Sequence, residues 1–333
     1  MHMKENDIRP NYLFDEYLKY CKEDIKKYFK KNIIKVNCPI CNSKKIHEKF
    51  TKNNFTYNWC LQCQTLYVSP LPSEDNFKKY YTEAKSVRFW ATDFYKHTEK
   101  KRKEKIFKPR IKLIKKIFIN EINHNIDTLI DIGAGYGSFC EIAMQDCFFK
   151  NIIAIEPSPY FIKILKEKNI FVIEKFMEEV IIDDFKNMNK EGIKLFCAFE
   201  IWEHLYSPQH FLQSIKNVMN KGDYLLITTL NILGFDLLML WDKSKSIQPP
   251  HHINIPNLKS LIFILESYGF KIEKAFTSGK LDVDIVKNMK ISFNNHLCNY
   301  IINDSDDIFR EKLQNFITKN NISSHMMIIA KLK

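Results

Sequence analysis

From Thr128 onward, short apolar segments alternate with amphipathic helical segments, and this alternation constrains the fold more than any other feature of the chain. Strands are expected at 128–132, 151–155, 171–173, 195–199, 224–229, 271–276 and 324–332. Helices are expected between them at 138–147, 159–168, 210–219, 258–268 and 308–319. Strands that alternate with helices form a parallel sheet with right-handed crossovers. The sequence therefore predicts an α/β domain over residues 121–333.

A glycine-rich turn joins the first of these strands to the helix that follows it. Residues 133–137 hold three of the eight glycines of the chain. Glycine permits positive φ angles and close approach of the backbone to a ligand, and the helix N-terminus beyond it favours negative groups. Glu156 ends the next strand, where its carboxylate can accept both hydroxyls of a ribose. These residues predict a nucleoside cofactor and leave open whether it carries nicotinamide or methionine.

Three segments resemble the motifs of class I S-adenosylmethionine-dependent methyltransferases. Leu129–Phe139 is similar to the first motif of that family, Ile153–Pro157 to the second, and Phe196–Leu205 to the stretch after the fourth strand. The resemblance implies S-adenosyl-L-methionine as the cofactor. It also implies a Rossmann-like sheet of seven strands in the order 3-2-1-4-5-7-6, with the last strand antiparallel.

The same resemblance implies a set of cofactor-binding residues at the carboxyl edge of the sheet. The first motif would line the methionine end, Glu156 the ribose, Phe176 the adenine, and Phe199 with Glu200 the sulfonium. The full set is Asp131, Gly133, Ala134, Gly135, Gly137, Phe139, Glu156, Pro157, Phe176, Phe199 and Glu200.

Acidic and histidine side chains after the fourth strand are candidate catalytic residues. Glu200, Glu203 and His204 are spaced i, i+3 and i+4, so a helical turn would place all three on one face. They could supply a general base at His204, hold a divalent cation that lowers the pKa of a hydroxyl, or only cap and pack a helix. His251 and His252, on a proline-bounded loop, are alternative bases.

Two cysteine pairs indicate a metal site. Cys38 and Cys41 form one C-x2-C pair, Cys60 and Cys63 form another, and 18 residues separate them. This spacing is typical of a zinc ribbon, here expected over residues 35–72. Four thiolates would close the coordination sphere, so the Zn²⁺ would be structural. Unliganded thiols or a redox dithiol are the alternatives.

The remaining segments complete the expected organisation. Residues 1–34 are expected to contain an amphipathic helix over 11–34, and residues 73–120 a helical connector. The insertions 233–256 and 277–322 would form a helical cap over an acceptor. The four-cysteine module and the Pro249–Pro256 segment resemble those of sugar and surface-glycan methyltransferases, which implies a sugar hydroxyl as the acceptor.

Charge and cysteine content bear on partners and compartment. Lys and Arg total 51 against 39 Asp and Glu, a formal charge of +12. The excess is spread along the chain, and its densest stretch, 96–116, is interpreted as a solvated helix face, so nucleic acid is not the favoured partner. Nine cysteines without an apolar leader predict a reducing cytoplasm. The apolar runs are too short to predict a membrane span.

Two other functions remain as alternatives to methylation of a sugar. The zinc ribbon and the positive charge are compatible with an RNA methyltransferase, and the same fold also serves small aromatic acceptors. A non-catalytic, zinc-stapled binding module is the third interpretation.

Overall fold

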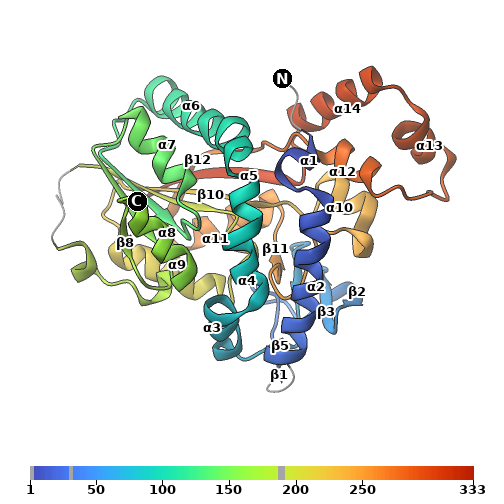
Figure 1. The fold of residues 1–333 in the computed structure, drawn as a ribbon, viewed down its shortest axis with the longest axis horizontal. Coiled ribbons are helices and arrows are strands. Elements are labelled where there is room, and N and C mark those ends of the chain that lie inside the picture. Colours follow the sequence, from blue (N-terminus) through green and yellow to red (C-terminus); the bar gives the residue numbers. More distant parts are fainter. Residues whose placement is uncertain (1–3, 30–32, 187–191) are drawn as a thin grey trace.

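The computed structural model describes residues 4–29, 33–186 and 192–333 and is built around a mixed sheet of seven strands (Figure 1). The strands are β6 (Thr128–Ile132), β7 (Asn151–Ile155), β8 (Phe171–Ile173), β9 (Lys194–Phe199), β10 (Tyr224–Leu230), β12 (Phe270–Thr277) and β13 (His325–Leu332). They lie in the order β12-β13-β10-β9-β6-β7-β8, with β13 antiparallel to both of its neighbours. In chain order this is 3-2-1-4-5-7-6, so the predicted fold class is confirmed.

Helices cover both faces of this sheet and bury its apolar side chains. The helices that alternate with the strands are α7 (Ser138–Asp146), α8 (Pro159–Glu167), α9 (Pro208–Val218) and α11 (Leu258–Ser267). On one face, α9 and α11 pack with Phe211 and Leu261 in a single hydrophobic cluster with the strands. On the other face, α7 contributes Phe139 and Ile142 to a second cluster. The apolar positions of each helix recur every three to four residues, which fixes the face that it buries.

A long helical segment precedes the sheet and carries the positive stretch of the sequence. It consists of α3 (Glu74–Glu83), α4 (Lys85–Phe89), α5 (Tyr95–Arg102) and α6 (Lys108–Lys116), with wider helical turns at Trp90–Phe94, Lys103–Phe107 and Ile117–Ile122. Ile111 and Ile114 pack against the sheet in the same cluster as Phe139. The C-terminal end of the segment therefore packs on the sheet, and its N-terminal end packs on the elements that precede it in the chain.

The N-terminal helices lie alongside this segment in Figure 1. They are α1 (Glu5–Ile8) and α2 (Asn11–Tyr28), and α2 packs on α4. The helix expected over 11–34 ends early: residues 30–32 lie outside the described residues, and β1 (Ile33–Ile34) pairs with β5 (Leu71–Pro72). Ile33 and Ile34 are β-branched and find a partner strand, which outweighs the helical spacing of the apolar residues. The expected helix was therefore too long at its C-terminal end.

The cysteine-bearing segment forms a small antiparallel sheet that takes its last strand from a distant part of the chain. Its strands are β2 (Ile46–Lys52), β3 (Phe55–Cys60), β4 (Leu66–Val68) and β11 (Asn254–Ile255), in the order β11-β4-β3-β2. Asn254 pairs with Tyr67, and Ile255 with Leu66. The ribbon is therefore continuous with the segment that was expected to cap the acceptor.

Four further helices precede or follow β12. They are α10 (Phe235–Leu240), α12 (Asp282–Asn288), α13 (His296–Asn299) and α14 (Asp307–Lys319). Three of them, α10, α12 and α14, share a separate apolar cluster, and Leu240, Val286 and Ile317 are buried together between these three helices. None of the helices within the described parts of the chain combines the length and the apolar character that a bilayer-spanning segment needs.

Candidate functional site

A cavity of about 780 Å³ opens at the carboxyl ends of the parallel strands β6, β7, β9 and β10. This is the edge at which open α/β sheets bind their ligands. The remaining walls come from other segments: Phe14 and Tyr17 on α2, and Tyr95 and Arg102 on α5. The N-terminal helices therefore close over the strand ends, a role that the sequence analysis did not assign to them.

Most of the predicted site residues line this cavity. They are Gly133, Gly135, Glu156, Pro157, Phe176, Phe199, Glu200, Glu203, His204, His251 and His252. Asp131, Ala134, Gly137 and Phe139 do not appear among the lining residues within the described part of the chain. The buried carboxylate of Asp131 accepts a hydrogen bond from the Cys140 thiol, with 3.3 Å between Sγ and Oδ2. Asp131 therefore connects β6 to α7 behind the cavity wall.

The glycine turn brings its backbone to the cavity surface. Gly133 and Gly135 have φ angles of 67° and 53°, in the left-handed region that favours glycine. A Cβ at Gly133 would overlap the side chain of Ile201. A Cβ at Gly135 would point into open space, with the Gly133 carbonyl oxygen 3.9 Å away. The positive φ angles therefore favour glycine at both positions, and a side chain at Gly133 would also clash with Ile201.

Glu156 ties the turn to the end of β7. Its Oε2 accepts the backbone N–H of Gly135 and its Oε1 accepts that of Ser158, both at 2.9 Å. Burial raises the pKa of Glu156 to about 7, although these two hydrogen bonds favour the charged form. Each carboxylate oxygen can accept a second hydrogen bond. Glu156 can therefore hold two hydroxyl groups of a ribose while it shapes the turn.

Arg110 lies on the cavity side of α6, although its stretch was interpreted as a solvated face. Its guanidinium carbon lies 4.3 Å from the centroid of the Phe199 ring. Burial lowers the pKa of Arg110, while the Glu200 charge raises it. No hydrogen bond from its guanidinium to another described residue is present. A half-buried guanidinium without acceptors among the described residues can bind a carboxylate or phosphate.

Glu200 is turned away from the residues with which it was grouped. It has a φ of 55°, and the helical turn that follows, Trp202–His204, begins two residues later. Its carboxylate accepts a hydrogen bond from Thr228 at 2.7 Å and pairs with His325 Nδ1 at 3.2 Å. The prediction that Glu200, Glu203 and His204 share one face is therefore wrong, because the strand continues into a left-handed residue rather than a helix.

His325 enters the site from β13, and no sequence motif pointed to it. Burial disfavours its charged form, but the Glu200 carboxylate outweighs burial and raises the pKa of His325 to about 9. Burial likewise opposes the charge of Glu200, and the His325 and Arg110 charges hold its pKa at about 2. The two residues therefore form an ion pair on the cavity wall at neutral pH.

Glu203, His204 and His252 gather on a neighbouring part of the cavity wall. One ligand atom from each lies within 4.8 Å of the other two. The backbone N–H of Ile253 donates to the Glu203 carbonyl oxygen at 2.8 Å, which draws the loop of His252 onto the turn of His204. Burial, together with the nearby Glu200 charge, raises the pKa of Glu203 to about 8.

The three histidines on this part of the cavity wall are uncharged at neutral pH. Burial lowers the pKa of His251 to about 3 and of His252 to about 4, and holds that of His204 well below its usual value. His204 Nδ1 lies 3.1 Å from the Tyr81 hydroxyl, and His251 Nε2 contacts the Tyr80 hydroxyl. Uncharged imidazoles carry a lone pair that can accept a proton or bind a metal ion.

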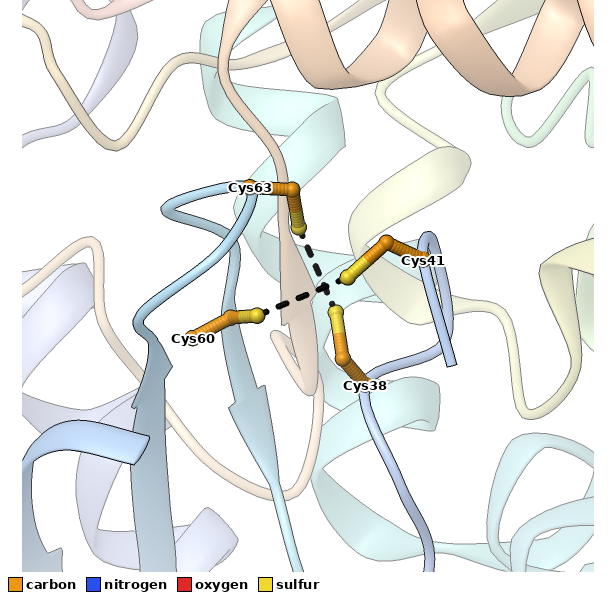
Figure 2. A group of neighbouring side chains, drawn as sticks. All are labelled: Cys38, Cys41, Cys60 and Cys63. Carbon is orange, nitrogen blue, oxygen red and sulfur yellow. Dashed lines mark hydrogen bonds between the residues drawn. The ribbon is translucent and has the colours of Figure 1, made fainter. Parts of the chain in front are cut away.

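The four predicted cysteine ligands converge on one point (Figure 2). Cys38 and Cys63 have their sulfur atoms 3.4 Å apart, and Cys41 and Cys60 have theirs 3.6 Å apart. A disulfide would need about 2.05 Å, whereas a zinc tetrahedron with Zn–S bonds of about 2.3 Å has sulfur atoms about 3.8 Å apart. The donor set and its spacing fit a Zn²⁺ ion.

Comparison with known proteins identifies one matching family model. A model described as a methyltransferase domain matches residues 95–275. No curated protein matches the chain. Among solved structures, a SAM-dependent methyltransferase from Archaeoglobus fulgidus is 22% identical, with 72% of this chain and 100% of that chain covered and a TM-score of 0.43. The plantazolicin methyltransferase BamL, solved with SAH, is 11% identical, with 77% and 94% covered and a TM-score of 0.49.

Proposed function

Since the chain belongs to the methyltransferase-domain family, whose model matches residues 95–275, we propose that it methylates a hydroxyl group of a sugar. It is an S-adenosylmethionine-dependent methyltransferase with the sheet order of that fold. The observation that carries the acceptor proposal is the composition of the cavity end beyond Glu200. Uncharged His204, His251 and His252 stand there beside the aromatic rings of Tyr17 and Tyr81.

The residues at the glycine turn would hold the cofactor. Gly133 and Gly135 present their backbone to its methionine part, and Glu156 accepts the ribose hydroxyls. Phe176, which lines the cavity past β8, would contact the adenine. When bound, S-adenosylmethionine supplies a methyl group on a positively charged sulfur, next to Phe199.

The histidine end would orient and deprotonate the acceptor. A sugar hydroxyl becomes a better nucleophile as it loses its proton, and the imidazole cluster provides lone pairs to receive it. The aromatic faces of Tyr17 and Tyr81 would pack against the apolar face of the sugar ring. Holding the hydroxyl in line with the transferred methyl supplies the rest of the rate enhancement.

The cysteine cluster would hold a structural zinc ion. Cys38, Cys41, Cys60 and Cys63 supply four sulfur donors and leave no position for a substrate. Thiolates in this number also support assignment to the cytoplasm, where cysteines stay reduced.

A calorimetric titration with S-adenosylmethionine tests the cofactor site. We expect one molecule to bind per chain, and Glu156→Ala to weaken binding about 10- to 100-fold, because hydrogen bonds to a charged group contribute roughly 1.5–3 kcal/mol. Glu167→Ala, an exposed glutamate on α8, is the matched control and should bind normally. Absence of binding, or normal affinity in Glu156→Ala, would contradict the assignment.

A methyl-transfer screen tests the acceptor. Nucleotide sugars, RNA and small aromatic alcohols would be offered with labelled cofactor, and the labelled product identified by mass spectrometry. We expect the label on a sugar oxygen. Transfer to RNA or to an aromatic acceptor alone would replace the proposal of a sugar.

A further inference from the structure

Glu203, His204 and His252 have the arrangement of a metal-binding triad that is separate from the cysteine cluster. They come from two segments 48 positions apart in the sequence, and their ligand atoms all lie within 4.8 Å of one another. All three line the cavity. Two imidazoles and one carboxylate are a ligand set that binds divalent transition metals and leaves positions open for substrate.

The surroundings fix each of these side chains in an orientation suited to a ligand. The Ser246 carbonyl oxygen accepts the Nδ1–H of His252, which leaves the Nε2 lone pair free. The Tyr81 hydroxyl holds Nδ1 of His204 at 3.1 Å. The Thr229 hydroxyl donates to Glu203 Oε2 at 2.6 Å, so Oε1 remains available. Metal-binding histidines characteristically have their second nitrogen hydrogen-bonded in this way.

His251 provides an internal comparison because it is adjacent in sequence and differently engaged. Its Nε2 contacts the Tyr80 hydroxyl and lies 3.7 Å from the Cys21 sulfur. It does not belong to the group of ligand atoms formed by the described residues Glu203, His204 and His252. The loop thus places His252 in the triad, whereas the side chain of His251 joins a buried polar network with Tyr80 and Cys21.

We propose that Glu203, His204 and His252 bind a divalent transition-metal ion that coordinates the acceptor oxygen. This rests on the proposed function, since the ion lies at the acceptor end of the methyltransferase cavity. The ion would lower the pKa of the acceptor hydroxyl and hold its oxygen as the proton passes to water in the cavity. As the oxygen bonds to the methyl carbon, the bond between that carbon and the sulfur would break. The electron pair of the broken bond would stay on the sulfur.

Metal counting tests the proposal with the full chain. The protein would be stripped of weakly bound ions, loaded with Zn²⁺, desalted and analysed by elemental mass spectrometry. We expect two ions per chain for the unchanged protein and one for His252→Ala. His251→Ala is the matched control and should keep two. Glu203→Gln, which preserves the shape of the side chain, should also lose the second ion.

Loading with Co²⁺ distinguishes the two sites by their ligands. The cysteine site gives strong sulfur-to-cobalt charge-transfer absorption, and the triad gives only weak d–d bands, which should vanish selectively in His252→Ala. One ion per chain in the unchanged protein, or two in both His252→Ala and Glu203→Gln, would overturn the proposal. S-adenosylmethionine titration and the acceptor screen of the same samples test the proposed function separately, since neither absence of cofactor binding nor transfer to another acceptor changes the number of bound metal ions.

Discussion

At the scale of single residues, the polar side chains that line the cavity differ in whether other residues of the protein already hydrogen-bond to them. Glu156 uses one acceptor position of each oxygen on the backbone of Gly135 and Ser158, and keeps the others available. Arg110 is the opposite case, because its guanidinium packs on Phe199 and has no acceptor among the described residues. The first residue was identified from its position after a strand. The second was hidden in a lysine-rich helix whose spacing indicated only a solvated face.

Arg110 leads to a prediction about cofactor recognition. We expect Arg110→Met to weaken binding of S-adenosylmethionine about 10- to 100-fold, because the carboxylate of the cofactor loses its charged hydrogen-bonding partner. Decarboxylated S-adenosylmethionine should bind the variant and the unchanged protein equally. Calorimetric titration with both compounds measures the difference, and exposed Arg88→Met serves as the control. An equal loss for both compounds would show that Arg110 acts on the shape of the site instead.

At the scale of elements, the ribbon supports the loop that carries the acceptor-side histidines. β4 pairs with β11, which begins two residues after His252, and the Val68 N–H donates to the Ile253 carbonyl oxygen at 2.9 Å. The Tyr57 hydroxyl of β3 donates to the carbonyl oxygen of His252 at 2.6 Å. The cysteine segment therefore positions the acceptor end of the cavity rather than forming an independent module.

Tyr57→Phe tests this support. Loss of one hydrogen bond of roughly 0.5–1.5 kcal/mol should lower kcat for methyl transfer about 2- to 10-fold, because the His252 loop is held less firmly. The affinity for S-adenosylmethionine should not change, since the glycine turn lies elsewhere. Tyr67→Phe is the matched control, because its hydroxyl makes no hydrogen bond to other described residues. Unchanged kcat in Tyr57→Phe, or an equal loss in both variants, would contradict the expectation.

At the scale of the whole molecule, the cysteine cluster shares its hydrophobic core with the main sheet. Cys38 and Cys60 are buried in the same cluster as Phe211 of α9 and Ile227 of β10. The Asn257 side chain, at the start of α11, donates to the Cys63 carbonyl oxygen at 2.7 Å. Loss of the metal should therefore affect the whole protein, and not the ribbon alone.

Removal of zinc provides the corresponding prediction. Cys60→Ser, or chelation, should lower the main unfolding temperature by roughly 5–10 °C. A loss of 1 kcal/mol in the free energy of unfolding lowers the unfolding temperature of a domain of about 150–250 residues by roughly 2–4 °C, and a structural zinc ion contributes several kcal/mol. Differential scanning calorimetry measures this shift. Exposed Cys147→Ser should leave the transition in place. A separate small transition, with the main one unchanged, would show that the ribbon folds by itself.

The sequence by itself determined the strands, the glycine turn, Glu156 and the two cysteine pairs, whereas the order of the strands was implied only by the resemblance to a known family. These features are local, because a strand, a tight turn or a metal knuckle is specified by residues a few positions apart. The tertiary structure alone decided that Glu200 pairs with His325, that Arg110 faces the cavity, and that His252 rather than Glu200 joins Glu203 and His204. Each of these contacts joins elements distant in sequence, and their distances depend on sheet pairing and helix packing that local periodicity does not encode.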